Sequence, residues 1–267
     1  MKNQIWVRRA ATTEAAQVVE IIQEGLGARV NERTIYGSSG IKRYVEDAIS
    51  AVDFSVPQFF AAGVGQQVLA VAQASIRQRN VMLSYICTRE GSRSMGLGRE
   101  LMKEVAQLGS EMDGSVILDV FRSNIRAIHW YQSFNFVETS KLGWWELISE
   151  RRSGGPNGPV VVSGLPQADV CHTQFGFSEF TLEVDSGSYH VGRLGSKWFR
   201  LTDVAAACDP DLVAALNKLE PGRALLVQCL IDDRTAKFLG DPVLESIHMS
   251  VEIGLLRSKL ESNSGLL

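Results

Sequence analysis

The sequence predicts an α/β (α+β) protein, with a mixed sheet flanked by helices followed by a second, smaller α/β domain. Short apolar runs that fit strands alternate with longer runs in which an apolar residue recurs every three or four positions, as on one face of a helix. Residues 151–159 then hold five glycine or proline residues in nine, which is typical of a linker. We therefore expect one domain at 1–150, a linker at 151–159 and a second domain at 160–267.

The first domain is expected to begin with a strand at 5–7 and a helix that Thr12 or Thr13 caps, because apolar residues recur at helical spacing through 15–26. The same spacing predicts a second helix at 41–52. The further elements expected are antiparallel strands at 58–64, 68–78 and 81–89, a helix at 99–108, a strand at 116–121, a helix after Asn124, and a closing hairpin whose strands, 136–142 and 144–148, meet at Gly143.

In the second domain, strand patterns occupy 177–184 and 189–203, and Asp209-Pro210 begins a helix that ends at Pro221-Gly222. A buried-type strand follows at 224–231, whereas 247–256 fits either a helix or a strand. These elements predict a small α/β domain. No second glycine-rich phosphate loop is found, because the segment 192–195 is too short for one.

The composition excludes several classes of protein. Of the 267 residues, 45% are hydrophobic and 21% are charged, as in globular proteins, and a formal charge of −3 gives no broad basic surface for nucleic acid. No run approaches the ~20 apolar residues of a membrane helix, and the N-terminus has no apolar signal-peptide core. We expect a cytoplasmic chain with no nucleic-acid or membrane partner. The sequence is compatible with a homodimer.

Cysteine and histidine spacing indicates no metal site. The cysteines are Cys87, Cys171, Cys208 and Cys229. They form no C-x-x-C pair, so neither a zinc site nor a disulfide framework is expected, and we interpret them as buried thiols. The histidines are His129, His172, His190 and His248. They are equally scattered, so structural or surface roles are expected for them.

A glycine-containing turn at 93–98 joins the strand at 81–89 to the helix at 99–108. Such a junction points unpaired backbone N–H groups and the positive end of a helix dipole at one spot, which favours a bound anion. Gly96 and Gly98 lack Cβ atoms, so a phosphate can approach the main chain closely. A pyrophosphate site is therefore one interpretation, and an ordinary strand-to-helix turn is the other.

The order of motifs that follows resembles the GNAT superfamily of acetyl-CoA-dependent N-acyltransferases. The family's phosphate loop, Q/R-x-x-G-x-G/A, is met by Arg93, Gly96 and Gly98. Its next motif combines an Asn, an Ala, a Tyr and a closing Gly-Phe; the first three are met by Asn124, Ala127 and Tyr131. The departure is at residue 135, where the family's Gly is Asn, a residue that tolerates left-handed backbone dihedrals better than most.

The resemblance covers about residues 1–150 and implies a mixed sheet opened by the cofactor between its fourth and fifth strands. It implies acetyl-CoA as the co-substrate, held by backbone amides of the loop and by the segments on either side. The cofactor-binding residues expected on this basis are Ile86, Cys87, Thr88, Arg93, Ser94, Met95, Gly96, Leu97, Gly98, Arg99, Asn124, Ala127 and Tyr131. A degenerate GNAT-like second half is left open.

The resemblance also implies catalytic roles. Tyr131 occupies the position of the tyrosine that faces the thioester sulfur, so it is the candidate acid, with packing as the alternative. Asp119, on the strand at 116–121, is the candidate base, although an orienting role is open because an Asp is short. Glu90 and Glu146 are expected to be solvated surface charges.

The sequence therefore favours an enzyme that transfers an acetyl group to a primary amine of a small molecule or peptide. The alternative is a non-catalytic acyl-CoA-binding sensor, and a dinucleotide-binding protein lacks its full G-x-G-x-x-G motif. Acceptor contacts are expected from 29–36 and 142–145. Further contacts are expected from a binding face of the second domain, formed by Tyr189, Arg193, Lys197 and Trp198, with a plain amphipathic strand as the alternative explanation of these residues.

Overall fold

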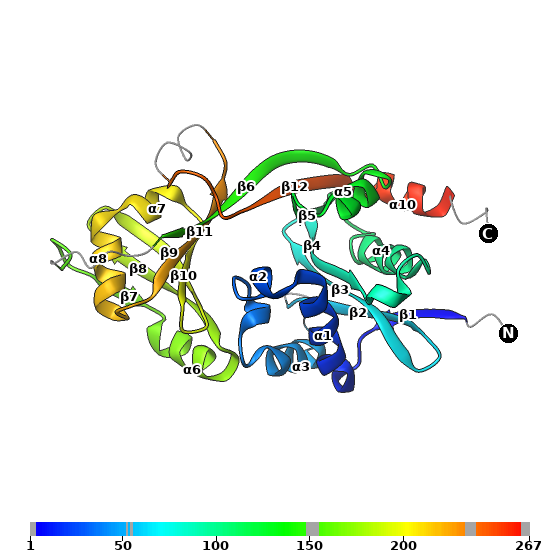
Figure 1. Ribbon diagram of the computed structural model, residues 1–267, viewed down its shortest axis with the longest axis horizontal. Helices are drawn as coiled ribbons and strands as arrows, with labels where there is room; N and C mark the ends of the chain where they lie inside the picture. Colours follow the sequence, from blue (N-terminus) through cyan, green and yellow to red (C-terminus); the bar gives the residue numbers. More distant parts are fainter. Residues whose placement is uncertain (1–3, 52, 54–55, 148–154, 233–238, 263–267) are drawn as a thin grey trace. The chain divides into compact units, whose positions relative to one another are not determined.

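The computed structural model describes residues 4–51, 53, 56–147, 155–232 and 239–262, and the chain divides into two compact units (Figure 1). The first unit comprises 1–28, 42–140 and 247–267, and the second comprises 29–41 and 141–246. This division differs from the expected one, because an early segment groups with the second unit and the C-terminal segment groups with the first. Of the expected linker, 151–154 lies outside the described residues.

The first unit confirms most of the elements expected in the first domain. Its strands are β1 (Ile5–Arg9), β2 (Gln58–Val64), β3 (Gln67–Arg77), β4 (Asn80–Thr88) and β5 (Ser115–Phe121). Its helices are α1 (Ala15–Leu26), α3 (Ile41–Ser50), α4 (Leu97–Leu108), α5 (Ile125–Gln132) and α10 (Ile253–Ser262). A short helix that the pattern did not predict, α2 (Ala28–Asn31), follows α1, and its residues from Arg29 on belong to the second unit.

The expected closing hairpin is wrong. Residues 137–147 form one continuous strand, β6 (Val137–Leu147), and Gly143 lies within it, paired with Cys229. A Cβ atom on Gly143 would lie 2.2 Å from the Trp145 ring, so the glycine is needed for close packing rather than for a turn. The ambiguous segment at 247–256 resolves into the end of strand β12 (Leu244–Glu252) and the start of α10.

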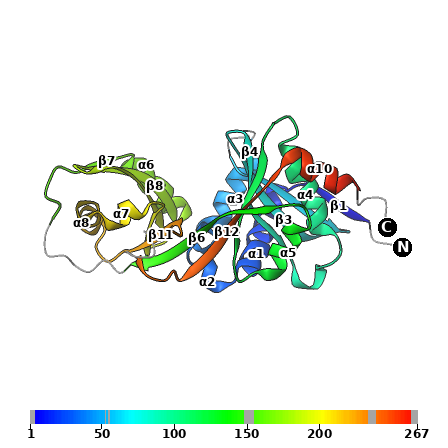
Figure 2. The same cartoon turned by 90° about the horizontal axis from the view of Figure 1, so that it is seen from above.

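The sheet of the first unit has the order β1-β2-β3-β4-β5-β12-β6, so β12 takes the place between β5 and β6. Figure 2 shows β12 running beside β6. Strands β1 to β4 pair antiparallel, and β4 pairs with β5 in parallel. The strand next to β5 thus comes from the C-terminal part of the chain, more than a hundred residues later.

Both faces of β3 are buried. Ala70, Ala72 and Ala74 belong to a core that includes Leu101 and Val105 of α4. The alternate residues of β3 face the other way, and α1 contacts β3 and β4. Small side chains let α4 approach the sheet closely. The C-terminal segment also contributes buried residues to this core: Ile247, Met249, Val251, Ile253, Leu256 and Leu260.

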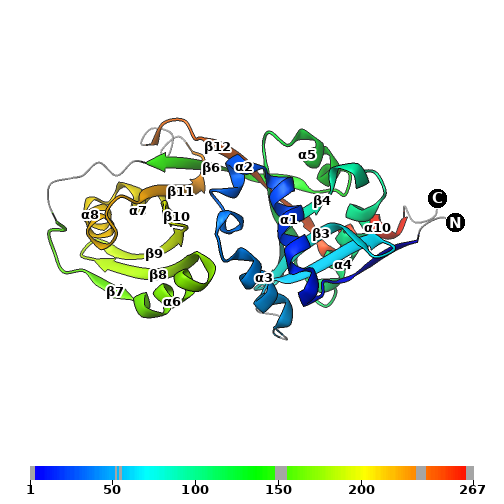
Figure 3. The same ribbon diagram turned by 60° about the horizontal axis from the view of Figure 1, so that its bottom comes forward.

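The second unit is an α/β unit, as expected, with additional helices. Its strands, besides the end of β6, are β7 (Val161–Ser163), β8 (Phe177–Val184), β9 (Gly187–Leu194), β10 (Trp198–Leu201) and β11 (Ala224–Leu230). Its helices include α6 (Leu165–Phe175), α7 (Val204–Cys208) and α8 (Pro210–Leu219), of which α7 and α8 lie side by side (Figure 3). The run expected as one strand at 189–203 is divided between β9 and β10.

The expected binding face of the second unit is wrong. Trp198 and Arg193 are buried, with 2% and 5% of their surfaces exposed, and Tyr189 donates its hydroxyl to Asp209 at 2.7 Å. Only Lys197 is exposed, with its Nζ atom 4.4 Å from the centre of the Trp198 ring. Arg193 and Trp198 therefore pack inside the unit and are not available as a binding face.

The second unit repeats the strand pattern of the first. Its order is β7-β8-β9-β10-β11-β6, with antiparallel pairs from β7 to β10 and a parallel pair between β10 and β11. In each unit, helices connect the two parallel strands. In each unit, too, the strand beyond the parallel pair comes from elsewhere in the chain: β12 beside β5, and β6 beside β11.

Candidate active site

Strands β4 and β5 separate part of the way along their length. Their parallel register covers three pairs, from Val81↔Val116 to Leu83↔Leu118, and ends there. On the other edge of β4, pairing with β3 continues to Thr88, with a register shift between Tyr85 and Leu83 that leaves Ser84 as an extra residue. The ends of β4 and β5 therefore form an open wedge, and the expected parting of the fourth and fifth strands is confirmed.

The wedge includes the β4 residues expected at the thioester. Ile86 packs against the core on the α4 side, while Cys87 faces α1: a Cβ atom on Gly25 would lie 2.6 Å from its sulfur. Strand alternation accounts for these opposite directions. The backbone of Ile86, Cys87 and Thr88 keeps its pairing with β3 and has no β5 partner in the described register.

At the end of β4 the loop at 93–98 leads into α4 with left-handed dihedrals at Ser94 (φ 72) and Gly96 (φ 84). Gly96 is the N-terminal flanking residue of α4, and no side chain caps this helix end. Within the described chain, no protein acceptor bonds the N–H groups of residues 94–98. Five consecutive amides without a protein acceptor at a helix N-terminus are suited to phosphate oxygens.

The roles expected for individual loop residues are partly revised. The Arg99 N–H donates to the Gly96 carbonyl at 3.0 Å, and its guanidinium donates to the carbonyl oxygen of Leu260, so neither group is free for a phosphate. A Cβ atom added to Gly98 would lie 3.2 Å from the Trp130 ring, whereas one added to Gly96 would have no atom within 4 Å. Arg93 and Met95 are exposed, and Leu97 is buried in the core.

Helix α5 follows β5 in the chain and contributes Ile128 and Tyr131 to the core that contains α4. Asn124 accepts a hydrogen bond from the Ala127 N–H at 3.2 Å, so its side chain caps α5. The Asn124 side chain is exposed. At the other end of α5, Asn135 adopts φ 66, in agreement with the left-handed role expected where the family has Gly.

Tyr131 is 8% exposed and packs between aromatic rings, 5.1 Å from Trp130 and 5.5 Å from Phe136 between ring centres. Burial raises the pKa of Tyr131, and the nearby Cys87 raises it further. Burial likewise raises the pKa of Cys87 to about 12. The phenol therefore holds its proton more firmly than a free tyrosine and is available as a hydrogen-bond donor.

Asp119 is the first β5 residue beyond the last pair with β4, and it contacts a histidine that the sequence analysis left out of the site. Its Oδ1 atom lies 2.7 Å from Nδ1 of His248 on β12. His248 is in turn fixed through its backbone oxygen, which accepts a hydrogen bond from the Thr139 hydroxyl at 3.2 Å. The only sequence signal for His248 was its position within an apolar run, which gave no hint of Asp119.

The segments expected to contact the acceptor, 29–36 and 142–145, both belong to the second unit. Their arginines are engaged: Arg29 donates to the Val243 carbonyl at 2.7 Å, and Arg33 pairs with Glu32 and Glu146. Glu146 is therefore an ion-pair partner rather than the solvated charge expected, whereas the Glu90 side chain is 90% exposed.

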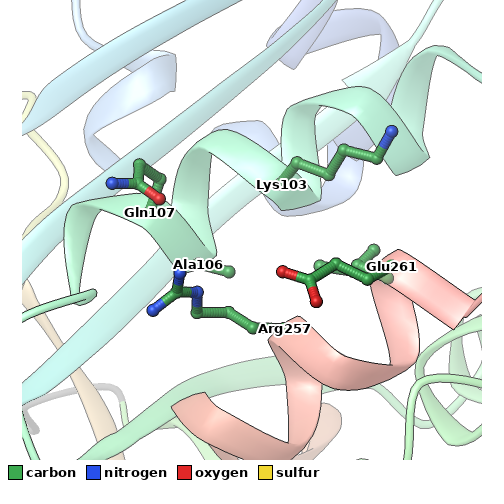
Figure 4. A pocket seen from close by; sticks show the side chains of 6 residues that line it. Lys103, Ala106, Gln107, Arg257 and Glu261 are labelled. Atoms are coloured by element: carbon green, nitrogen blue, oxygen red, sulfur yellow. The ribbon is translucent and has the colours of Figure 1, made fainter.

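A separate pocket of about 260 Å³ lies between α4 and α10 (Figure 4). Lys103 and Gln107 of α4 line it together with Arg257 and Glu261 of α10. None of its lining residues belongs to the wedge, the loop at 94–98 or α5. This pocket is distinct from the candidate active site.

Of the cysteines expected to be buried, Cys229 is buried and Cys87 is intermediate, but Cys171 and Cys208 are exposed, so the expectation fails for those two. Within the described part of the chain, no three histidine, cysteine or acidic side chains gather closely enough to hold a metal ion. Nor is any described helix long and apolar enough to cross a membrane.

Comparison with known proteins places this arrangement in a class. Residues 34–136 match the sequence model of the acetyltransferase (GNAT) family. The chain therefore contains a GNAT acetyltransferase domain. A search among curated proteins found no match to the sequence.

Three solved structures share the fold over nearly the whole chain. One is a putative acetyltransferase from Pyrococcus horikoshii, with a TM-score of 0.64 and 14% identity over 94% of this chain and 90% of that one. A second, described as a tandem GNAT protein from the clavulanic acid biosynthesis pathway, has a TM-score of 0.66 and 12% identity over 94% and 99%. The third is a GCN5-related N-acetyltransferase from Sphaerobacter thermophilus, with a TM-score of 0.61 and 12% identity over 93% and 96%. At these identities the likeness establishes the fold of both units.

Proposed function

We propose that the protein is an N-acyltransferase that binds acetyl-CoA in the first unit and transfers its acetyl group to a primary amine of a small molecule or peptide. The proposal is carried by the wedge between β4 and β5 together with the loop that follows β4. Among the described residues, the five backbone N–H groups at 94–98 have no hydrogen-bond acceptor in the protein. These amides suit the pyrophosphate of a CoA-type cofactor, and the strand ends that no longer pair suit the thioester arm that leads from it.

The wedge also supplies groups for the chemistry. As the amine nitrogen bonds to the thioester carbon, charge develops first on the carbonyl oxygen and then on the sulfur. Backbone N–H groups of β4 beyond Leu83 lie on its unpaired edge and suit the oxygen. Tyr131 suits the sulfur, because its firmly held proton makes the phenol a donor to the developing thiolate.

Gly96→Asp tests the phosphate site. The substitution places a carboxylate where the pyrophosphate would lie and should abolish acetyl-CoA binding. The matched control is Gly222→Asp, because Gly222 also has a positive φ (94, against 84 for Gly96) and also has nothing within 4 Å of an added Cβ atom. Both variants share the strain of a non-glycine residue at positive φ, which is roughly 1–2 kcal/mol, and both add one carboxylate, so only the location of that charge differs.

Calorimetry on the folded variants should show acetyl-CoA binding to the wild type and Gly222→Asp but not to Gly96→Asp. Equal affinities in all three would reject the phosphate site. Release of free CoA, followed with a thiol reagent across a panel of amines, separates an enzyme from an acyl-CoA-binding sensor, which would bind without turnover. The exposed Cys171 and Cys208 require a control without acetyl-CoA, since they also react with the reagent.

A further inference from the structure

His248 and Asp119 form a hydrogen-bonded pair on neighbouring strands, β12 and β5. The 2.7 Å contact joins Nδ1 of the imidazole to Oδ1 of the carboxylate. A carboxylate only accepts hydrogen bonds, so Nδ1 carries the hydrogen and Nε2 of a neutral His248 keeps its lone pair. Each side chain is 27% exposed, so the free Nε2 atom belongs to a side chain that a second molecule can reach.

Both side chains lie on the sheet face opposite the α4 core. On β5, the neighbours of Asp119 are Leu118 and Val120, and both belong to that core. On β12, the core residues on either side of His248 alternate with it in the same way. Because successive strand residues face opposite sides, the pair shares the face toward which Cys87 points.

The pair also lies at the narrow end of the wedge. The last β4–β5 pair is Leu83↔Leu118, and Asp119 is the next residue of β5. The loop at 94–98 follows the far end of β4, so an arm anchored there by its pyrophosphate runs back along the wedge towards the point where the strands part. The acyl end of that arm is thereby brought to the strand position that carries Asp119.

We propose that His248 is the general base of the acyl transfer and that Asp119 is its positioning residue, an inference that rests on the function proposed above. Nε2 of His248 accepts a proton from the amine as the nitrogen–carbon bond forms. The carbon–sulfur bond then breaks, and its electron pair leaves with the sulfur of CoA, which Tyr131 hydrogen-bonds. The products are an amide, the CoA thiolate and a histidinium, which returns its proton to water.

This assignment changes the role of Asp119. Its carboxylate is already engaged by the imidazole, and an aspartate has a short reach, whereas His248 extends from the next strand and keeps one nitrogen unbonded to Asp119. A histidine oriented by a carboxylate is the usual arrangement for a general base. The base thus comes from the C-terminal segment, outside the residues 34–136 that match the GNAT family.

The first test pairs His248→Gln with His190→Gln. His190 forms the same kind of pair, with Nε2 3.0 Å from Glu179, but it belongs to the second unit and is 62% exposed. With the amine of the panel that is turned over fastest, His248→Gln should lower kcat/KM by about 10²–10⁴ and leave the acetyl-CoA affinity unchanged, while His190→Gln should match the wild type. Turnover in His248→Gln within about twofold of the wild type would overturn the proposal.

A second measurement needs no acceptor. Long-range ¹H–¹⁵N NMR should find the hydrogen of neutral His248 on Nδ1, and in Asp119→Ala this preference should be lost while the acetyl-CoA affinity is kept. Diethyl pyrocarbonate should modify His248 and His190 in the free protein, and acetyl-CoA should protect His248 alone. A hydrogen on Nε2, or equal modification of His248 with and without bound acetyl-CoA, would overturn the assignment. Failure of acetyl-CoA to bind the wild type would instead reject the proposed function.

Discussion

Each unit contains one pair of parallel strands, β4–β5 in the first and β10–β11 in the second, joined by helical segments. The two units differ in how far these strands pair and in how the helices between them begin. In the first unit, β4 and β5 pair over three residues and then part, and α4 begins without a side-chain cap. In the second, all four residues of β10 pair with β11, from Trp198 to Leu201. Asp203 caps α7 by accepting from the Ala205 N–H at 2.8 Å, and Asp209 caps α8. We call the strand pair and the helix start of the first unit the open junction, and those of the second unit the closed junction.

The closed junction shows what the open one lacks. Asp209 accepts hydrogen bonds from the N–H groups of Asp211 and Leu212 and from two hydroxyls, those of Ser186 and Tyr189. Burial alone would raise the pKa of Asp209, but these hydrogen bonds lower it overall. The helix end that would attract a phosphate is thus occupied by a carboxylate of the chain itself. A repeated fold therefore provides an anion site only where the sequence leaves the helix amides free.

The largest expected effect concerns the strand that completes the first unit. A chain ending at residue 246 loses β12 and α10, and with them six buried residues of the first core, so it should fail to fold and should aggregate.

A smaller change in the same segment is Leu256→Ala, at a side chain with no exposed surface, which should cost about 2–5 kcal/mol in the free energy of unfolding. Denaturant unfolding measures this, and Leu255→Ala, 48% exposed, is the control.

A truncated chain that remains soluble and binds acetyl-CoA would show that the first unit does not need β12. That result would support the domain boundary near residue 150 expected from the sequence. Loss of folding would instead explain why a linker-based boundary is insufficient: the glycine- and proline-rich stretch lies between β6 and β7, yet the chain returns to the first unit after it.

Local patterns predicted the parts of the site that local physics determines. The strand β4, the loop at 93–98 and α4 follow one another in sequence, so hydrophobic period and glycine placement were enough to predict them. The partner of β5 could not be predicted in this way, because β12 is separated from it by more than a hundred residues and its pattern fits two structures. His248 was missed for the same reason. The hairpin at Gly143 failed because a glycine in a strand can mark close packing as well as a turn.

The next effect in size concerns Tyr131. Tyr131→Phe keeps the ring contacts with Trp130 and Phe136 and removes only the hydroxyl, so stability and acetyl-CoA affinity should change little. Turnover should fall by about 10²–10³, the usual cost of losing one donor to a developing charge. Steady-state kinetics with the fastest amine measures this. A rate within about twofold of the wild type would leave Tyr131 as a packing residue and reduce the difference between the two units to cofactor binding.

A smaller effect is expected at the closed junction. Asp203→Ala removes the α7 cap and should lower the free energy of unfolding by about 1 kcal/mol. The number of acetyl-CoA molecules bound per chain should stay at one in calorimetry, because β10 and β11 do not part and no wedge is created. Gain of a second binding site would show that the cap alone distinguishes the units. An unchanged stability would show that water replaces the carboxylate at no cost.

The smallest expected effect is a pH dependence confined to the second unit. Burial lowers the pKa of His172, and the neighbouring Arg193 and Arg223 lower it further, although Glu220 opposes them. The folded protein thus favours the neutral imidazole, whereas the unfolded chain takes up a proton near the ordinary value of 6.5. The stability from this difference is present above that pH and is lost as the pH falls below it. His172→Gln should therefore be less sensitive to acid than the wild type when urea unfolding is compared on the two sides of pH 6.5. Equal sensitivity in the two proteins would mean that the His172 contacts with Arg223 and Ser178, at 3.3 and 3.5 Å, do not depend on its charge.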